Sequence, residues 1–172
     1  METPVLDTRR TGWTGAAERV ISFWSLMGGF MVVAVVLMNV WAVVASILGI
    51  PFGGDFELTQ MGIAIAAFAF LPYCQITGGN VAADIFTARA SQFWVSVFAL
   101  AASIVALLFG LLLLYSMYGG MLSQRQYNYT TAILQIPIWW AYLPCLFSLV
   151  LLAVASLITL LDNLGKTVRG GT

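Results

Sequence analysis

The chain has 172 residues, of which 61% are hydrophobic and 8% are charged, and its formal net charge is zero. Average soluble domains carry about 25% charged residues, so this composition excludes a soluble globular protein. The balanced charge offers no electrostatic footprint for nucleic acid. Histidine is absent from the sequence, which removes the common haem ligand, most zinc chemistry and the imidazole proton shuttle. We therefore expect no metal and no cofactor.

The seven basic and seven acidic residues leave long uncharged segments between them, at residues 20–54, 58–83, 90–124 and 126–161. A bilayer span takes about 20 apolar residues, so each segment is long enough to cross. We predict an all-α integral membrane protein, a single domain over residues 1–172. Its four transmembrane helices are expected at about 21–48, 58–77, 92–118 and 138–161. The first segment exceeds the apolar core of a signal peptide, so we interpret it as an uncleaved span.

Turn-forming residues and charges mark the ends of the first two spans. Pro51 and the glycines at 53–54 end the first span, and Asp55 and Glu57 indicate a connector that meets water. The second span stops at the Gly-Gly-Asn triplet of residues 78–80, which is typical of a helix C-terminus.

Residues 81–91 are predicted to form a short helix that lies in the membrane interface between the second and third spans. Val81 and Ile85 fall on one face of such a helix, and Asp84 and Arg89 lie off it. A carboxylate suits the first turn of a helix because the helix dipole is positive there, which is sufficient to explain Asp84.

The longest polar connector covers residues 119–136. Pro137 follows it and is predicted to open the fourth span at the first helical position, where the missing N–H breaks no hydrogen bond. Trp139 and Trp140 come next, and an aromatic pair at the end of a span is typical of an anchor in the membrane interface.

Lysine and arginine are distributed unevenly between the two sides of the membrane. One side, made by the two tails and the 78–91 connector, holds Arg9, Arg10, Arg19, Arg89, Lys166 and Arg169. The opposite side holds only Arg125. The positive-inside rule therefore places both termini in the cytoplasm.

Two polar side chains admit either a structural or a functional interpretation. Asn39 lies deep in the first span, where an interhelical hydrogen bond is the more economical explanation and coordination of an ion is the alternative. Glu57 enters the second span, where it either favours the helix N-terminus or contacts another subunit. We find no nucleophile with a base, phosphate loop or metal-ligand spacing, so no catalytic residue is predicted.

The two cysteines are predicted to stay unpaired. Cys74 lies late in the second span and Cys145 lies early in the fourth, and these spans run in the same direction. Their depths should therefore differ by about 10–15 Å, which is more than the ~7 Å that a disulfide allows between Cα atoms. Both are interpreted as apolar packing residues.

Two stretches resemble the small membrane subunit of the tripartite ATP-independent periplasmic (TRAP) transporters. Residues 56–84, FELTQMGIAIAAFAFLPYCQITGGNVAAD, keep the family's spacing between a glutamate, here Glu57, and an aspartate, here Asp84. Residues 136–142, IPIWWAY, resemble the family's opening of the fourth span, with Pro137, Trp139 and Trp140 at the matching positions. The chain departs from the family pattern at four positions, Val43, Phe56, Asn80 and Ala82.

The resemblance implies a bacterial inner-membrane subunit without chemistry of its own. In such systems a periplasmic binding protein delivers an organic acid to a large multi-span subunit, which moves it inward with sodium. The small subunit would be a scaffold that packs against the large subunit, and Asn39, Glu57, Asp84, Pro137, Trp139 and Trp140 are candidate interface or structural residues. The charge-free spans agree, because an organic carboxylate needs a cationic or helix-end site near the midplane.

Other classes of membrane protein remain as alternatives. A redox or quinone-associated subunit is disfavoured because the sequence has no histidine. A self-sufficient small exporter would need an acidic residue inside the membrane, and none of the four segments has one. A membrane assembly factor is the third alternative, and only the resemblance to the TRAP small subunit argues against it.

Overall fold

A computed structural model describes residues 13–77 and 92–169 of the chain. They form α1 (Trp13–Ile47), α2 (Asp55–Ile76), α4 (Gln92–Gln126) and α5 (Trp139–Arg169). All four helices are long and apolar enough to cross a membrane, which confirms the predicted all-α architecture of four spans. The interfacial helix predicted at residues 81–91, with Asp84, lies outside the described residues.

All four helices extend beyond the spans predicted for them at one end; α2 begins at Asp55 rather than at about residue 58, and the other three extend further. α1 begins at Trp13, α4 continues to Gln126, and α5 continues to Arg169. The sequence prediction followed apolar character, whereas backbone hydrogen bonding continues through the polar residues at each end. A helix of 35 residues, such as α1 or α4, is about 52 Å long. The hydrocarbon core is about 30 Å thick, so the helix ends reach past it or the helices tilt.

The fourth helix begins later than predicted. Pro137 was expected at the first helical position, but α5 starts at Trp139 and Pro137 belongs to the preceding connector. There it forms an isolated antiparallel bridge with Thr130, and the Ile138 N–H donates to the Tyr129 carbonyl over 3.1 Å. These connector hydrogen bonds hold residues 137–138 outside the helix.

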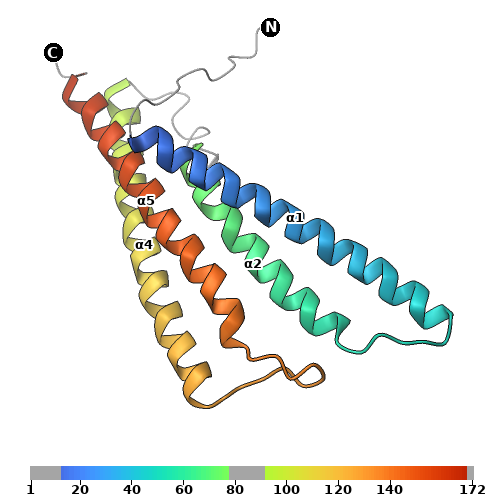
Figure 1. The fold of residues 1–172 in the computed structure, drawn as a ribbon. Coiled ribbons are helices and arrows are strands. Elements are labelled where there is room, and N and C mark those ends of the chain that lie inside the picture. Colours follow the sequence, from blue (N-terminus) through green and yellow to red (C-terminus); the bar gives the residue numbers. More distant parts are fainter. Residues whose placement is uncertain (1–12, 78–91, 170–172) are drawn as a thin grey trace, which may run out of the picture.

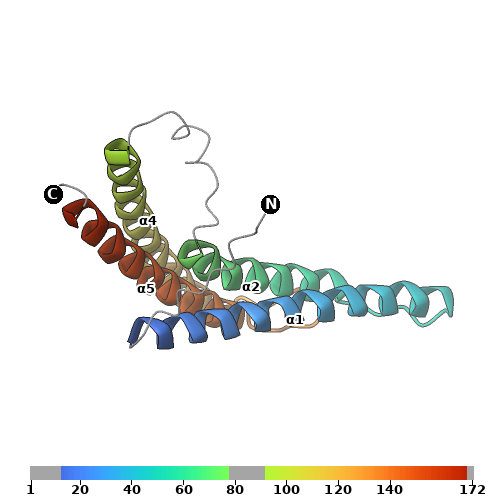
Figure 2. The ribbon, with the colours of Figure 1, turned by 90° about the horizontal axis from the view of Figure 1, so that it is seen from above.

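The helices lie in a row rather than in a closed bundle. α1 packs on α2, α2 on α5, and α5 on α4, while α1 meets α5 over only a short stretch. The start of α1 and the end of α5 lie at the same end of the molecule (Figure 1), which we call the terminal end. Residues 48–54 and 127–138 lie at the opposite, connector end. Seen from above, α1 and α2 run side by side as one hairpin, and α4 and α5 form a second (Figure 2).

A small apolar core joins the two hairpins toward the terminal end. Its residues come from three helices and are Ile21, Ile76, Leu151, Ala155 and Ile158. Elsewhere most large apolar side chains are exposed; Phe23, Phe30 and Leu37 of α1 are each more than 60% exposed. In a bilayer this surface faces lipid or a partner, because lipid supplies no hydrophobic drive to bury it.

Glycines allow α1 and α2 to approach closely. A Cβ placed on Gly28 would lie 2.8 Å from the Cβ of Ala69, and one placed on Gly62 would overlap Val35. The small residues of the second span therefore serve packing within the chain, as small residues commonly do between membrane helices. Cys74 and Cys145 are free thiols, the first exposed and the second buried.

Candidate functional site

Four of the predicted site residues gather at the connector end of the molecule. Glu57 lies in the first turn of α2, Pro137 lies in the connector that leads to α5, and Trp139 and Trp140 form the first turn of α5. Asn39 lies elsewhere, in α1. The structure thus brings together residues from two hairpins that are about 80 positions apart in the chain.

The carboxylate of Glu57 binds the backbone of the α4–α5 connector. The Ile133 N–H donates to Oε1 over 2.7 Å, and the Leu134 N–H donates to Oε2 over 3.1 Å. The Thr131 side chain and the Ala132 backbone also interact with this carboxylate. Glu57 is therefore engaged within its own chain, across a sequence separation of 76 residues.

Sequence analysis did not foresee this partner of Glu57. The position in the first turn of α2 agrees with a favourable helix-dipole interaction. The donors, however, are backbone amides, which every residue except proline offers. No side-chain pattern in residues 131–134 could have identified them.

The connector is itself a compact loop. The Thr131 N–H donates to the Ile136 carbonyl over 3.0 Å, and the Ile136 N–H donates to the Thr131 hydroxyl over 3.0 Å. Gln135 turns the chain with a φ of 53°, a conformation that is uncommon outside glycine. The loop thus presents the Ile133 and Leu134 amides to Glu57 from a defined backbone.

Gly54 fits α2 against the same loop. Its φ of 99° lies in the region that favours glycine, and a Cβ at this position would overlap the Leu134 side chain. The glycine that ends the first connector therefore has two reasons to lack a side chain.

The two tryptophans differ in their surroundings. Arg125, at the end of α4, lies over the Trp139 ring with its guanidinium carbon 5.6 Å from the ring centroid. This is a cation–π contact, and it links α4 to the start of α5. The Trp140 ring packs edge-on against Trp139 at 6.0 Å but is itself 57% exposed. Trp140 is the member of the pair that remains available to lipid or a partner.

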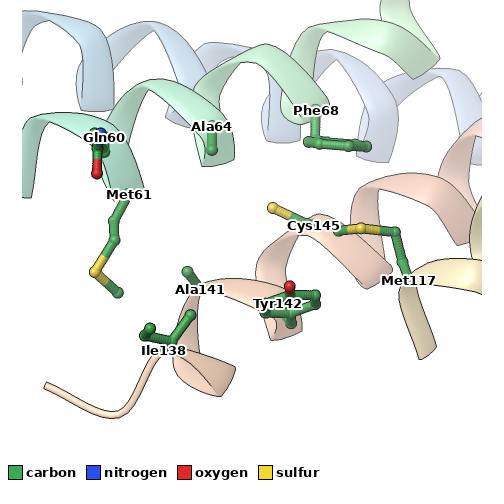
Figure 3. Close-up of a pocket in the computed structure, with 9 residues that line it drawn as sticks. All are labelled: Gln60, Met61, Ala64, Phe68, Met117, Ile138, Ala141, Tyr142 and Cys145. Carbon is green, nitrogen blue, oxygen red and sulfur yellow. The ribbon is translucent and has the colours of Figure 1, made fainter. Parts of the chain in front are cut away.

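A hollow of about 270 Å³ separates α2 from the start of α5, with α4 contributing one side chain (Figure 3). Most of its lining is apolar, and Gln60 and Tyr142 add polar groups. The remaining lining residues are Met61, Ala64, Phe68, Met117, Ile138, Ala141 and Cys145. In Figure 3 the α2 and α5 side chains face each other across this space.

Asn39 forms a hydrogen bond that joins α1 to α2. Its Nδ2 donates to the Thr59 hydroxyl of α2 over 2.8 Å and to the Val35 carbonyl of its own helix over 2.8 Å. A comparable bond joins α5 to α4, from Asn163 Nδ2 to the Ser103 hydroxyl over 2.8 Å. Such bonds between membrane helices fix register more than they add stability.

The arrangement at the connector end holds α2, the α4–α5 connector and α4 together through Glu57, Trp139 and Arg125. Among residues 13–77 and 92–169, no three His, Cys, Asp or Glu side chains come together as the ligands of a metal would. The hydrogen bonds of Glu57 and the cation–π contact of Trp139 make the connector end a structural joint between the two hairpins.

One comparison with known proteins identifies a family. The family model for "Tripartite ATP-independent periplasmic transporters, DctQ component" matches residues 31–165. The match covers most of the chain and includes Asn39, Glu57, Pro137 and both tryptophans of the pair. No curated relative and no solved structure matches the chain.

Proposed function

This chain belongs to the DctQ component family of the tripartite ATP-independent periplasmic transporters, and on that premise we propose that it is the small scaffold subunit of a sodium-coupled importer of organic acids. The large multi-span subunit moves the substrate, and a periplasmic binding protein delivers it. The small subunit packs against the large one and stabilises it in the bacterial inner membrane, with both of its termini in the cytoplasm.

The observation that carries this proposal is the continuity of four uncharged spans. α2 and α5 run unbroken through Pro72 and Pro144, so neither offers a helix end at mid-depth. An organic carboxylate in the membrane needs such a helix end or a cationic side chain near the midplane. In the described residues the charged side chains lie in the end turns or in the polar extensions of the helices. This favours a supporting role over a substrate site.

In this proposal the connector end contacts the large subunit. Trp140 is exposed and packs edge-on against Trp139, and tryptophan is among the residues that contribute most at protein interfaces. Glu57 is occupied by the connector amides, so in this proposal it acts on the partner through the shape of the connector. Trp139 anchors α5 to α4 through Arg125.

Affinity purification tests the pairing. The subunit is purified in mild detergent from cells that express its whole operon, and the yield of the large subunit is quantified. We expect stoichiometric recovery with the wild-type chain and reduced recovery with Trp140→Ala. Trp13→Ala is the matched control, because Trp13 is also an exposed tryptophan, at 60%, but lies at the terminal end.

Recovery of the wild-type subunit alone, as a monodisperse homo-oligomer, would contradict the proposal.

Reconstitution tests which subunit carries out transport. Liposomes that contain this subunit and the binding protein should take up no organic acid, whereas addition of the large subunit should give sodium-dependent uptake. Saturable uptake by the small subunit without the large one would show that the scaffold assignment is wrong.

A further inference from the structure

We propose that Glu57 is a positioning residue that straps the α4–α5 connector to α2 and thereby sets the angle between the α1–α2 hairpin and the α4–α5 hairpin. The proposal concerns the geometry of this chain and does not depend on the transport function. It follows from an asymmetry between the two ends of the molecule.

Toward the terminal end the hairpins are joined by packed side chains. Ile21 of α1, Ile76 of α2 and Ile158 of α5 belong to one apolar cluster, and each is at most 9% exposed. Close packing of this kind resists separation and leaves only rotation about the joint as an easy motion. The cluster can therefore act as the pivot of the two hairpins.

Toward the connector end the facing helices are separated. The hollow of about 270 Å³ lies between residues 60–68 of α2 on one side and, on the other, Ile138 of the connector with residues 141–145 of α5. Beyond it, Glu57 of α2 binds the α4–α5 connector, and Gly53 and Gly54, which directly precede α2, lie against Ile133 and Leu134 of the same connector. An apolar hollow open to lipid provides little resistance to a change in width, so the contacts with the connector must provide it, and among them the hydrogen bonds of Glu57 are the ones that originate in α2 itself.

The strap is well suited to this task. A carboxylate that accepts two backbone N–H groups forms charge-assisted hydrogen bonds, which are about twice as strong as neutral ones. The connector that donates them is closed by the Thr130–Pro137 bridge. The connector is also tied to α4, because Trp139 directly follows it and Arg125 covers the Trp139 ring. Glu57 thus links α2 to both helices of the other hairpin.

Removal of the carboxylate should let the hairpins rotate about the terminal-end core and vary the width of the hollow. If the chain also serves as the rigid part of a transporter, which rests on the proposed function, the strap is what keeps that part rigid. Asp55 provides a matched control, because it lies in the same first turn of α2 but has no hydrogen bond to the connector among those described.

Pulsed electron–electron double resonance measures the distance between two spin labels, and a distance between the connector ends of the two hairpins reports the angle between them. Cys74→Ser and Cys145→Ala remove the native thiols, and labels at Leu48 and Leu122 report the connector ends of the two hairpins, because both side chains are exposed. A second pair, at Phe23 and Leu161, reports the terminal end. The full-length chain is measured in lipid nanodiscs with Glu57, Glu57→Gln, Glu57→Ala or Asp55→Asn.

We expect the Leu48–Leu122 distance distribution to broaden and shift in Glu57→Ala, less so in Glu57→Gln, and not at all in Asp55→Asn. The Phe23–Leu161 distribution should stay unchanged in every variant. If Glu57→Ala fails to insert, the Glu57→Gln sample carries the same comparison, because it keeps the side-chain length and loses one acceptor. An unchanged distribution in Glu57→Gln and Glu57→Ala, or equal broadening in Asp55→Asn, overturns the strap.

Sodium-dependent uptake by the complete transporter then tests separately whether the strap keeps the rigid part of the transporter rigid. Uptake should fall in Glu57→Ala and stay at the parent level in Asp55→Asn. A broadened distance distribution with unchanged uptake would leave the strap intact and overturn only its role in transport.

Discussion

The indole nitrogen of Trp24 in α1 donates a 2.8 Å hydrogen bond to the hydroxyl of Ser148 in α5. The Ser148 hydroxyl in turn donates to the Pro144 carbonyl over 2.8 Å, so the group uses both its donor and its acceptor capacity. The Trp24 ring also packs edge-on against Phe147 at 4.6 Å. α1 and α5 touch over only a short stretch, and Trp24 supplies both a hydrogen bond and a ring contact within it.

Replacement of Ser148 by alanine should destabilise the fold modestly. Hydrogen bonds between membrane helices average about 0.6 kcal/mol and reach about 1.7 kcal/mol, and we expect a loss in that range. Unfolding in mixed micelles with increasing SDS measures it. Ser116→Ala, at an exposed position of α4, is the control and should be neutral. A double-mutant cycle with Trp24→Phe should show coupling; simple additivity would argue against the bond.

Gly28 and Gly29 are adjacent in α1 and should respond differently to the same substitution. A Cβ at Gly28 would lie 2.8 Å from the Ala69 Cβ, whereas a Cβ at Gly29 would meet nothing within 4 Å. We expect Gly28→Ala to cost about 1–3 kcal/mol through overpacking of α1 on α2. Gly29→Ala should be neutral or slightly stabilising, because alanine favours helix over glycine. The same SDS titration compares them, and equal effects would contradict the packing of α1 on α2.

Asn39 is expected to matter for the α1–α2 contact and not for ion coupling. Asn39→Ala removes the donor to the Thr59 hydroxyl and should lower stability by about 0.6 kcal/mol. In the complete transporter the dependence of uptake on sodium concentration should be unchanged. Thr59→Val is the reciprocal variant, and a shift of the sodium dependence in either one would instead favour ion coordination.

Topology can be tested with single cysteines in a variant that lacks the two native thiols. Cysteines at Ile50 and Tyr127, which are 73% and 65% exposed, should react with a membrane-impermeant maleimide added to intact spheroplasts. Cysteines at positions 5 and 170 should react only after lysis, since the positive-inside rule predicts that both termini lie in the cytoplasm. Gly54 is a poor site for this purpose, because its backbone and its contact with Leu134 exclude a side chain. Labelling of position 5 or 170 from outside would reverse the proposed orientation.

The amino-acid sequence by itself determined the number of spans, their approximate positions and the absence of charge from them. These properties depend on the free energy of transferring each segment from water into hydrocarbon, and that free energy is a sum of contributions from neighbouring residues. The resemblance at residues 56–84 and 136–142 also led to the family that the matched model shows. Helix ends were less well predicted, as at Trp139, because backbone hydrogen bonds and not apolar character decide where a helix begins.

Only the tertiary structure decided which residues meet. The sequence placed Glu57 at the start of a helix, but its partners are two backbone amides 76 and 77 positions away, which carry no signature of their own. It likewise could not show that the hairpins are packed together toward one end and separated by a hollow toward the other. In a bilayer, apolar character marks every face of a helix alike, so which faces come together depends on close packing and on a few polar contacts.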